Sequence, residues 1–162
     1  MALIKLNNQS ISAVSALPSG ISTGKVGQVV AGSSAGVVTV TTTSYTTICT
    51  VNITPTATSS KILLIGTIGE PDYIDGRLAG RFFADSTEIN SSETRFIAEM
   101  GRNLSSVGSE THRGNVTQSI LHSPNTTSQV TYTIKIARTL GSGTVRVGNG
   151  GSNTIIAQEI LA

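Results

Sequence analysis

The chain has little of what equips many small secreted domains and enzymes. Its 162 residues include a single cysteine, Cys49, and no Trp. One cysteine cannot form a disulfide within the chain, which excludes small secreted domains that depend on disulfides and fits folding in a reducing cytosol. Charged residues make up 12% of the chain, about half the usual share. Few side chains therefore remain for acid–base catalysis.

Charge of one sign does not gather anywhere in the sequence. The 11 Lys and Arg against 9 Asp and Glu give a net charge of +2, and the basic residues are scattered from Lys5 to Arg146. Nucleic-acid-binding proteins concentrate cations and add stacking aromatics, whereas aromatic residues are 4% of this chain. The first 20 residues hold no run near the roughly 18 apolar residues of a membrane span. We therefore expect no nucleic-acid partner, no signal peptide and no membrane span.

Strand-forming segments rich in β-branched residues dominate from Val37 onward. Hydrophobic residues make up 38% of the chain, which is enough for a packed core. Residues 130–138 alternate apolar and polar, which predicts a strand with one buried and one solvated face. Residues 62–65 are continuously apolar, which is typical of a strand covered on both faces. The other predicted strands are residues 37–43, 49–53, 77–84, 94–100, 117–121, 144–148 and 154–160.

This rhythm of short strands predicts an all-β fold. Eight or nine strands in about 125 residues favour an antiparallel β-sandwich of jelly-roll type over a seven-stranded immunoglobulin domain. After residue 36, no segment of ten or more residues has the apolar stripe of a helix, so α/β nucleotide-binding folds are excluded. Asn149 and Gly150 predict a hairpin turn after a strand at residues 145–147.

The first 36 residues differ in composition from the rest and predict an extended N-terminal arm. The run GSSAG at residues 32–36 has the composition of a flexible joint. We therefore expect residues 1–36 to form the arm and joint, and residues 37–162 to form the sandwich head. The apolar spots of the arm are too short for a stable isolated helix, so we expect the arm to order against a partner. The apolar residues of these spots are Leu3, Ile4, Leu6, Ile11, Val14 and Leu17.

Polar clusters offer candidate sites, each with a simpler interpretation. Glu70, Asp72 and Asp75 gather in GEPDYIDG; oxygen-rich loops of this kind can hold calcium, but the spacing matches no EF-hand and a solvated turn is the simpler interpretation. Tyr73 in the same loop is a candidate for stacking on a sugar. His122 opens the turn HSPN and has no Cys or carboxylate at metal-ligand spacing. We interpret it as a turn residue, or as one that approaches a neighbouring subunit, and we expect no metal site and no cofactor.

A second candidate surface follows from residues 77–84. If this segment is a strand, Arg77, Arg81 and Phe83 share one face. Arginine with an aromatic ring is common in protein interfaces and carbohydrate contacts, although an exposed strand edge with protective charges has the same pattern. Cys49 shares a face with apolar residues and is expected to be a small buried hydrophobe. The sequence has no G-x-S-x-G motif, and we expect no enzymatic activity.

Three segments of the sequence also carry a resemblance to a known family. They are the opening MALIKLNN, the segment NITPTATSSKILL at residues 52–64, and the C-terminal stretch from HSPNTTSQVTYTIK to NTIIAQEI. Together they resemble short bacteriophage tail-fibre or virion-surface proteins, especially those of marine phages, over nearly the whole chain. The resemblance implies an N-terminal arm that docks onto capsid, portal or tail proteins, and a projecting β-sandwich head that is commonly a homotrimer.

The resulting hypothesis is a non-enzymatic virion-surface protein that is assembled in the host bacterial cytoplasm and presents its head to a host glycan or protein. A capsid decoration or cement protein is the alternative. A carbohydrate-active enzyme is a third hypothesis, and it would need two carboxylates held across a cleft. The six apolar arm residues are the expected docking residues. The expected interface or receptor contacts are Tyr73, Arg77, Arg81, Phe83 and His122.

Overall fold

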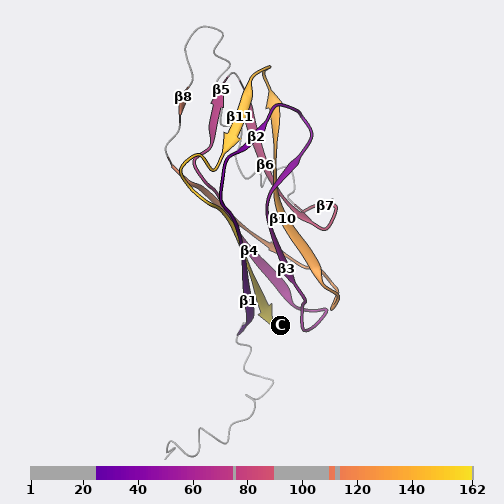
Figure 1. Cartoon of the computed structure of the whole chain (residues 1–162). Coiled ribbons are helices and arrows are strands. Elements are labelled where there is room, and N and C mark those ends of the chain that lie inside the picture. The colour runs from indigo at the N-terminus through magenta and orange to yellow at the C-terminus, as the bar shows by residue number, and fades with distance from the viewer. Residues whose placement is uncertain (1–24, 75, 90–109, 112–113, 162) are drawn as a thin grey trace, which may run out of the picture.

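Neighbouring strands run antiparallel throughout the described structure. The computed structural model describes residues 25–74, 76–89, 110–111 and 114–161, and these residues form twelve strands and no helix (Figure 1). The strands are β1 (Lys25–Ser34), β2 (Val38–Val40), β3 (Thr46–Ile53), β4 (Lys61–Ile68), β5 (Asp72–Ile74), β6 (Arg77–Ala84), β7 (Thr87–Glu88), β8 (Glu110–Thr111), β9 (Val116–His122), β10 (Val130–Leu140), β11 (Thr144–Val147) and β12 (Asn153–Leu161).

The strand pairs are nested one inside the next. β1 pairs with β12, β2 with β11 and β3 with β10. Further inward, β4 pairs with β9, β5 with β8 and β6 with β7. The first and second halves of the chain thus form one long two-stranded ribbon whose tip is the β6–β7 hairpin. Three more pairs, β12 with β4, β11 with β5 and β10 with β6, join the turns of this ribbon side by side.

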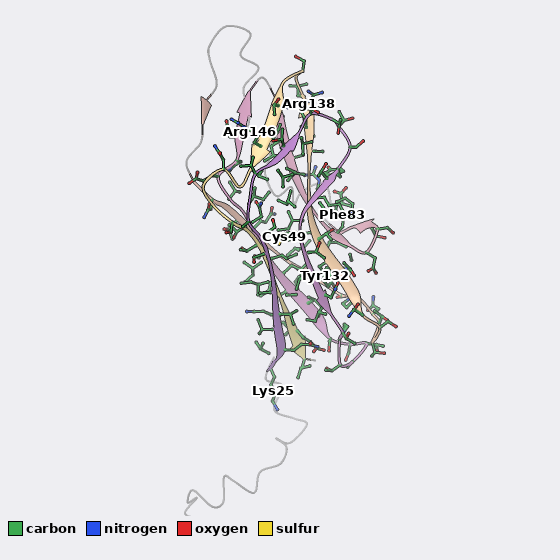
Figure 2. All side chains as sticks on the ribbon, viewed as in Figure 1. Lys25, Cys49, Phe83, Tyr132, Arg138 and Arg146 are labelled. Atoms are coloured by element: carbon green, nitrogen blue, oxygen red, sulfur yellow. The ribbon has the colours of Figure 1, made fainter. Side chains whose placement is uncertain are left out.

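The ribbon forms three four-stranded sheets. Sheet I has the order β1-β12-β4-β9, sheet II the order β3-β10-β6-β7, and sheet III the order β2-β11-β5-β8. Sheets I and II pack face to face as in a β-sandwich, with β3 contacting both β1 and β12. Sheet III lies at the end of the molecule opposite Lys25 and the C-terminus (Figures 1 and 2). The molecule therefore has two distinct ends.

Alternating side chains of the long strands fill the core between sheets I and II. In β10, Tyr132, Ile134 and Ile136 are fully buried, which confirms the predicted alternation. Each such side chain stabilises the fold by about 1.5–3 kcal/mol relative to full exposure. Cys49 of β3 is also buried, and burial raises the pKa of its thiol. Cys49 therefore packs as a small hydrophobe, as predicted.

The continuously apolar segment at residues 62–65 has only one face in the core. Ile62 and Leu64 are fully buried, whereas Leu63 and Ile65 project from the opposite side of β4 and keep intermediate exposure. The expected covering on both faces is therefore wrong for the described residues of this one chain.

Strand β1 occupies residues that the sequence assigned to the arm and its joint. Gly32, in the expected flexible run, lies where β1 passes β3, and a β-carbon there would collide with the Thr50 carbonyl. Glycine at this position therefore serves a close backbone approach instead of flexibility. The sandwich already includes Lys25, which pairs with Leu161. The arm residues before Lys25 lie outside the described residues.

Two further expectations have different outcomes. Asn149 and Gly150 do not close a hairpin, because β11 pairs with β2 and β5 while β12 pairs with β1 and β4. The predicted strand at residues 94–100 lies outside the described residues.

The burial pattern predicts the effect of a core truncation. Ile134→Ala should lower the free energy of unfolding by about 2–5 kcal/mol, because it removes buried methyl groups and leaves a cavity. Thr50→Ala, at an exposed position of the neighbouring strand β3, is the control and should stay within about 0.5 kcal/mol of the wild type. Urea denaturation followed by circular dichroism measures both. Equal effects for the two variants would contradict the assigned core.

Candidate interaction surfaces

An aromatic and cationic cluster lies on the outer side of sheet II, around Phe83 of β6. The Phe83 ring is 9% exposed and packs edge-on against Tyr45, with ring centroids 5.5 Å apart. The Nζ atom of Lys135, on β10, lies 4.3 Å from the centre of the same ring. Such a cation–π contact contributes about 0.5–1 kcal/mol at an exposed site. Tyr45 keeps 38% of its surface exposed and is the accessible ring of the pair.

The guanidinium of Arg81 is engaged within the chain. Its Nε atom lies 2.9 Å from Oε1 of Glu88 on β7, and its Nη1 atom donates a hydrogen bond to the carbonyl of Gly80. β6 spans the predicted residues, so Arg81 lies two positions from Phe83 on the same side of the strand. This ion pair holds the β6–β7 tip and leaves Tyr45 and Lys135 as the polar outer members of the surface. We call Tyr45, Arg81, Phe83, Glu88 and Lys135 the Phe83 cluster.

The carboxylates expected in one loop have separate roles. Asp72 is 1% exposed and forms an ion pair with Nη2 of Arg146 on the paired strand β11. Glu70 lies against Gly150, where a β-carbon would collide with its carboxylate. Asp75 is not among the described residues. In the described part of the chain, no three His, Cys, Asp or Glu side chains come together as metal ligands.

Sheet III positions two more of the expected contact residues. Tyr73 pairs through its backbone with Val145 in β5 and β11. Arg77 begins β6, and its carbonyl accepts a hydrogen bond from Oγ1 of Thr139. Arg138 donates from Nη1 to the carbonyl of Gly143, and both Arg138 and Arg146 lie at the end opposite Lys25 (Figure 2). This end of the molecule therefore carries several arginines.

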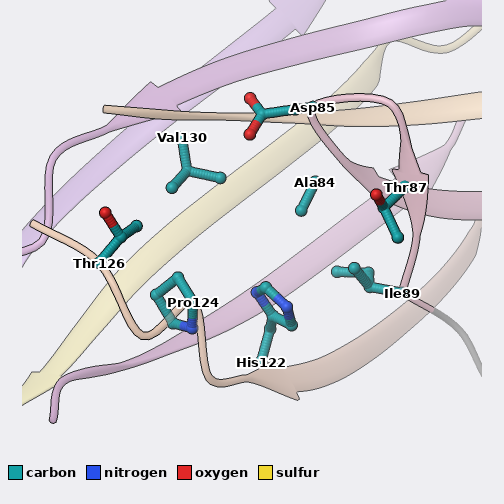
Figure 3. A pocket seen from close by; sticks show the side chains of 8 residues that line it. All are labelled: Ala84, Asp85, Thr87, Ile89, His122, Pro124, Thr126 and Val130. Atoms are coloured by element: carbon teal, nitrogen blue, oxygen red, sulfur yellow. The ribbon is translucent and has the colours of Figure 1, made fainter. Parts of the chain in front are cut away.

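A small pocket separates the β6–β7 turn from the segment that joins β9 to β10 (Figure 3). Its volume is about 260 Å³, slightly below the usual range for small-molecule sites. Apolar and polar side chains line it together. They are Ala84, Asp85, Thr87, Ile89, His122, Pro124, Thr126 and Val130.

His122 connects this pocket to the core. It ends β9, and its Nδ1 atom lies 2.9 Å from Oη of Tyr132, with the two rings edge-on. Burial lowers the pKa of His122, so the neutral imidazole is favoured. Burial also raises the pKa of Tyr132, and the negative charge of Asp85 raises it further. His122 is thus a partly buried residue held by the core instead of a free turn residue.

Sequence reasoning missed a buried carboxylate at the end of the sandwich near Lys25. Glu159 of β12 is fully buried, and its Oε1 atom accepts hydrogen bonds from the backbone N–H and the Oγ1 hydroxyl of Thr56. Its Oε2 atom accepts a hydrogen bond from Nε2 of Gln28 in β1, at 2.8 Å. The signal was present, because the alternation of Ile155 and Ala157 places Glu159 on the core face.

Glu159 therefore joins β1, the turn after β3, and β12. Burial acts to raise its pKa, but the hydrogen bonds from Gln28 and Thr56 outweigh this effect and lower the pKa to about 2. A charged carboxylate with several donors is a strong anchor. It holds the start of β1, where the preceding residues enter the sandwich.

The lowered pKa of Glu159 predicts a specific pH dependence. Its ionised form favours the fold at neutral pH, and this contribution, at most about 3 kcal/mol, is lost as the pH falls from 4.5 toward 2. Glu159→Gln should reduce stability at pH 7 and flatten the pH dependence in this window. Glu88→Gln, which alters an exposed ion pair, is the matched control and should change stability by less than about 1 kcal/mol. Thermal unfolding at several pH values measures this, and parallel curves for wild type and Glu159→Gln would contradict the assignment.

The remaining expectations concern docking and membranes. The six apolar arm residues, at positions 3–17, lie outside the described residues. Within the described ranges, no helix is long and apolar enough to cross a membrane.

Comparisons with known proteins leave the function to be argued from the surfaces above. No protein-family model matches the chain, and no curated protein matches it either.

Proposed function

We propose that this chain is a non-enzymatic surface protein of a bacteriophage particle, docked through its N-terminal residues and presenting its β-sandwich for host attachment. The carrying observation is the polarity of the molecule. Lys25 pairs with Leu161 at one end, while sheet III lies at the other (Figure 1). A chain anchored by the residues before Lys25 would therefore direct sheet III away from the anchor.

The strand order supports a sandwich of jelly-roll type. A jelly roll places eight antiparallel strands in two packed sheets. Sheets I and II hold eight strands in the orders β1-β12-β4-β9 and β3-β10-β6-β7, and every strand of the first half pairs with its nested counterpart in the second half. A single ribbon folded over itself gives this order. Sheet III then extends both main sheets at the end away from Lys25.

The proposed docking segment is residues 1–24, the described sandwich beginning at Lys25. Its six apolar residues would be buried against capsid, portal or tail proteins, and each large side chain buried would contribute about 1.5–3 kcal/mol. The Glu159 anchor supports this proposal, because it holds the first residues of β1. A pull on the docked segment would thus be passed to the core and not to a loose end.

Host attachment is proposed to use the Phe83 cluster and the sheet III end. Tyr45 offers an exposed ring, and Lys135 lies beside the same aromatic pair. Aromatic rings with neighbouring cations suit the apolar faces and hydroxyl groups of a glycan. Tyr73 and Arg77, at the sheet III end, would extend the contact. Homotrimeric heads on a virion would add avidity to a weak single contact.

A capsid decoration or cement protein is the second candidate. The observation that favours it is the direct passage from the N-terminal residues into β1, with no repetitive shaft between them. A protein seated close to the particle would clamp neighbouring subunits and need no long reach. Both candidates share virion-surface location after assembly in the host bacterial cytoplasm, and in both the chain acts by binding.

Particle incorporation tests the docking segment. Changing Leu3, Leu6, Ile11 and Leu17 together to Ser should abolish incorporation into phage particles, because the apolar contacts are lost while the sandwich still melts as in wild type. The matched control changes Asn7, Asn8, Ser10 and Ser12 to Ala and should incorporate normally. Quantifying the chain in purified particles measures both. Normal incorporation of the Ser variant would refute docking by these residues.

Adsorption separates attachment from cementing. The purified full chain should bind host cells and compete with phage adsorption, and Tyr45→Ala should weaken binding by about tenfold or more through loss of an aromatic contact. Asn52→Ala, at an exposed position of sheet II, is the control. Particles that lack the chain but adsorb normally, and that break at lower temperature, would instead support the decoration protein.

A further inference from the structure

The outer side of sheet I carries an apolar surface that the fold of one chain leaves uncovered. Alternation places Ile155, Ile62 and Leu64 in the core and their neighbours on the opposite side of the sheet. Strand register brings these outward residues into adjacent rows. We call this set the apolar face. Its members are Val26, Val29, Ala31, Leu63, Ile65, Leu121, Ile156 and Ile160.

Rows across the sheet make the apolar face continuous. Ala31 lies opposite Ile156, which lies opposite Ile65. In a parallel row, Leu63 lies opposite Leu121 on β9. The large residues at the margins are well exposed, with 54% of Val29 and 53% of Leu121 accessible. The face thus runs from edge strand β1 to edge strand β9.

This arrangement departs from the usual antiparallel sheet, whose outer face is polar. The outer side of sheet II follows the usual pattern, with exposed Thr50 and Asn52 and partly exposed Thr131 and Lys135. On sheet I, Lys61 borders the apolar face, and among the described residues no carboxylate projects from it. A contiguous apolar surface of this kind marks an interaction site. The absence of paired charges favours a partner that is itself apolar.

We propose that the apolar face packs against the same face of two further copies around a threefold axis. The inference rests on the proposed function, whose homotrimer it supplies with an interface. A second copy matches the chemistry, because each copy contributes the same uncharged surface. Ser33, Thr67, Thr117 and Thr154 form a hydroxyl row at one margin, which suits the polar rim of an interface.

The width of the apolar face favours three copies. Four strands at about 4.8 Å spacing give a face about 19 Å wide. Three such faces arranged as a triangular prism would each lie about 5.5 Å from the axis, close to half of the about 10 Å between stacked sheets. Four faces would lie about 9.5 Å from the axis and leave a void that close-packed interiors do not contain.

The area of the face points to the same number. Seven residues along β12 span about 20 Å, so the face covers about 400 Å² in projection. Two faces would bury about 800 Å², which is below the range of specific interfaces, whereas three would bury about 1,200 Å² and reach it. Gln158 interrupts the rows between Val29 and Leu63, and its amide can both donate to and accept from its symmetry copies.

The solution mass of the full chain tests this interface. Wild type should have three times the 16.7 kDa chain mass, or 50.1 kDa, by native mass spectrometry. Ile156→Glu and Leu121→Glu should each raise the concentration of half-assembly by more than about a hundredfold, because the interface would have to bury unpaired carboxylates. Asn52→Glu, with the same added charge on the outer side of sheet II, should remain trimeric. Circular dichroism and thermal melting confirm folding, and Leu121, on the edge strand β9, is the substitution less demanding of the fold.

Each other outcome overturns the proposal. A wild-type dimer or monomer would exclude the threefold interface and leave the face to another occupant, such as residues 1–24. Trimers that persist in a folded Leu121→Glu variant would place the contact elsewhere. Incorporation into particles is measured on the same variants: a monomeric wild type that still incorporates would refute this interface and leave the docking proposal standing. A trimer that never incorporates would do the reverse.

Discussion

The pairing of β1 with β12 is the constraint on which the rest of the structure depends. It brings the first and last described strands together, and every other pair is nested inside it. Strands of one half find their hydrogen-bond partners in the other half, so few backbone groups can be satisfied locally. Loop closure must therefore precede most favourable contacts, which makes such a topology slow to fold. Glu159 reinforces this closing pair at its open end by accepting hydrogen bonds from Gln28 in β1 and from Thr56.

The same pairing gives the molecule its functional polarity. Because β1 and β12 begin and end side by side, the segment that enters the sandwich and the C-terminus share one end (Figure 1). The opposite end is built from sheet III, where Asp72 and Arg146 join adjacent strands. The two main sheets also differ on their outer sides: sheet II is polar and carries the Phe83 cluster, whereas sheet I is apolar. Docking, presentation and self-association can thus use separate surfaces of one small sandwich.

Strand positions were the most predictable feature of this protein. The alternation at residues 130–138 and the segment 77–84 predicted β10 and β6, because a half-buried strand must place apolar side chains at every second position. The Asn149-Gly150 turn signal was misleading, because the pairing of β12 with β1 and β4 overrides a local hairpin preference. The candidate sites were less predictable. Arg81 and Phe83 do share a surface, but Tyr45, Glu88 and Lys135 join them only through strand pairing, and Tyr132 reaches His122 from a neighbouring element.

By itself, the sequence determined the all-β class, the antiparallel sheets and most of the core, since period-two alternation is a local property of the chain. It also excluded disulfides, because Cys49 has no partner within the chain. Only the tertiary structure decided that β1 belongs to the sandwich, that Glu159 is an anchor, and that Leu63 and Ile65 join Ile156 on an uncovered face. Those outcomes depend on which distant strands become neighbours. That choice is made by the packing of the whole chain, because each strand's own pattern fits several partners equally well.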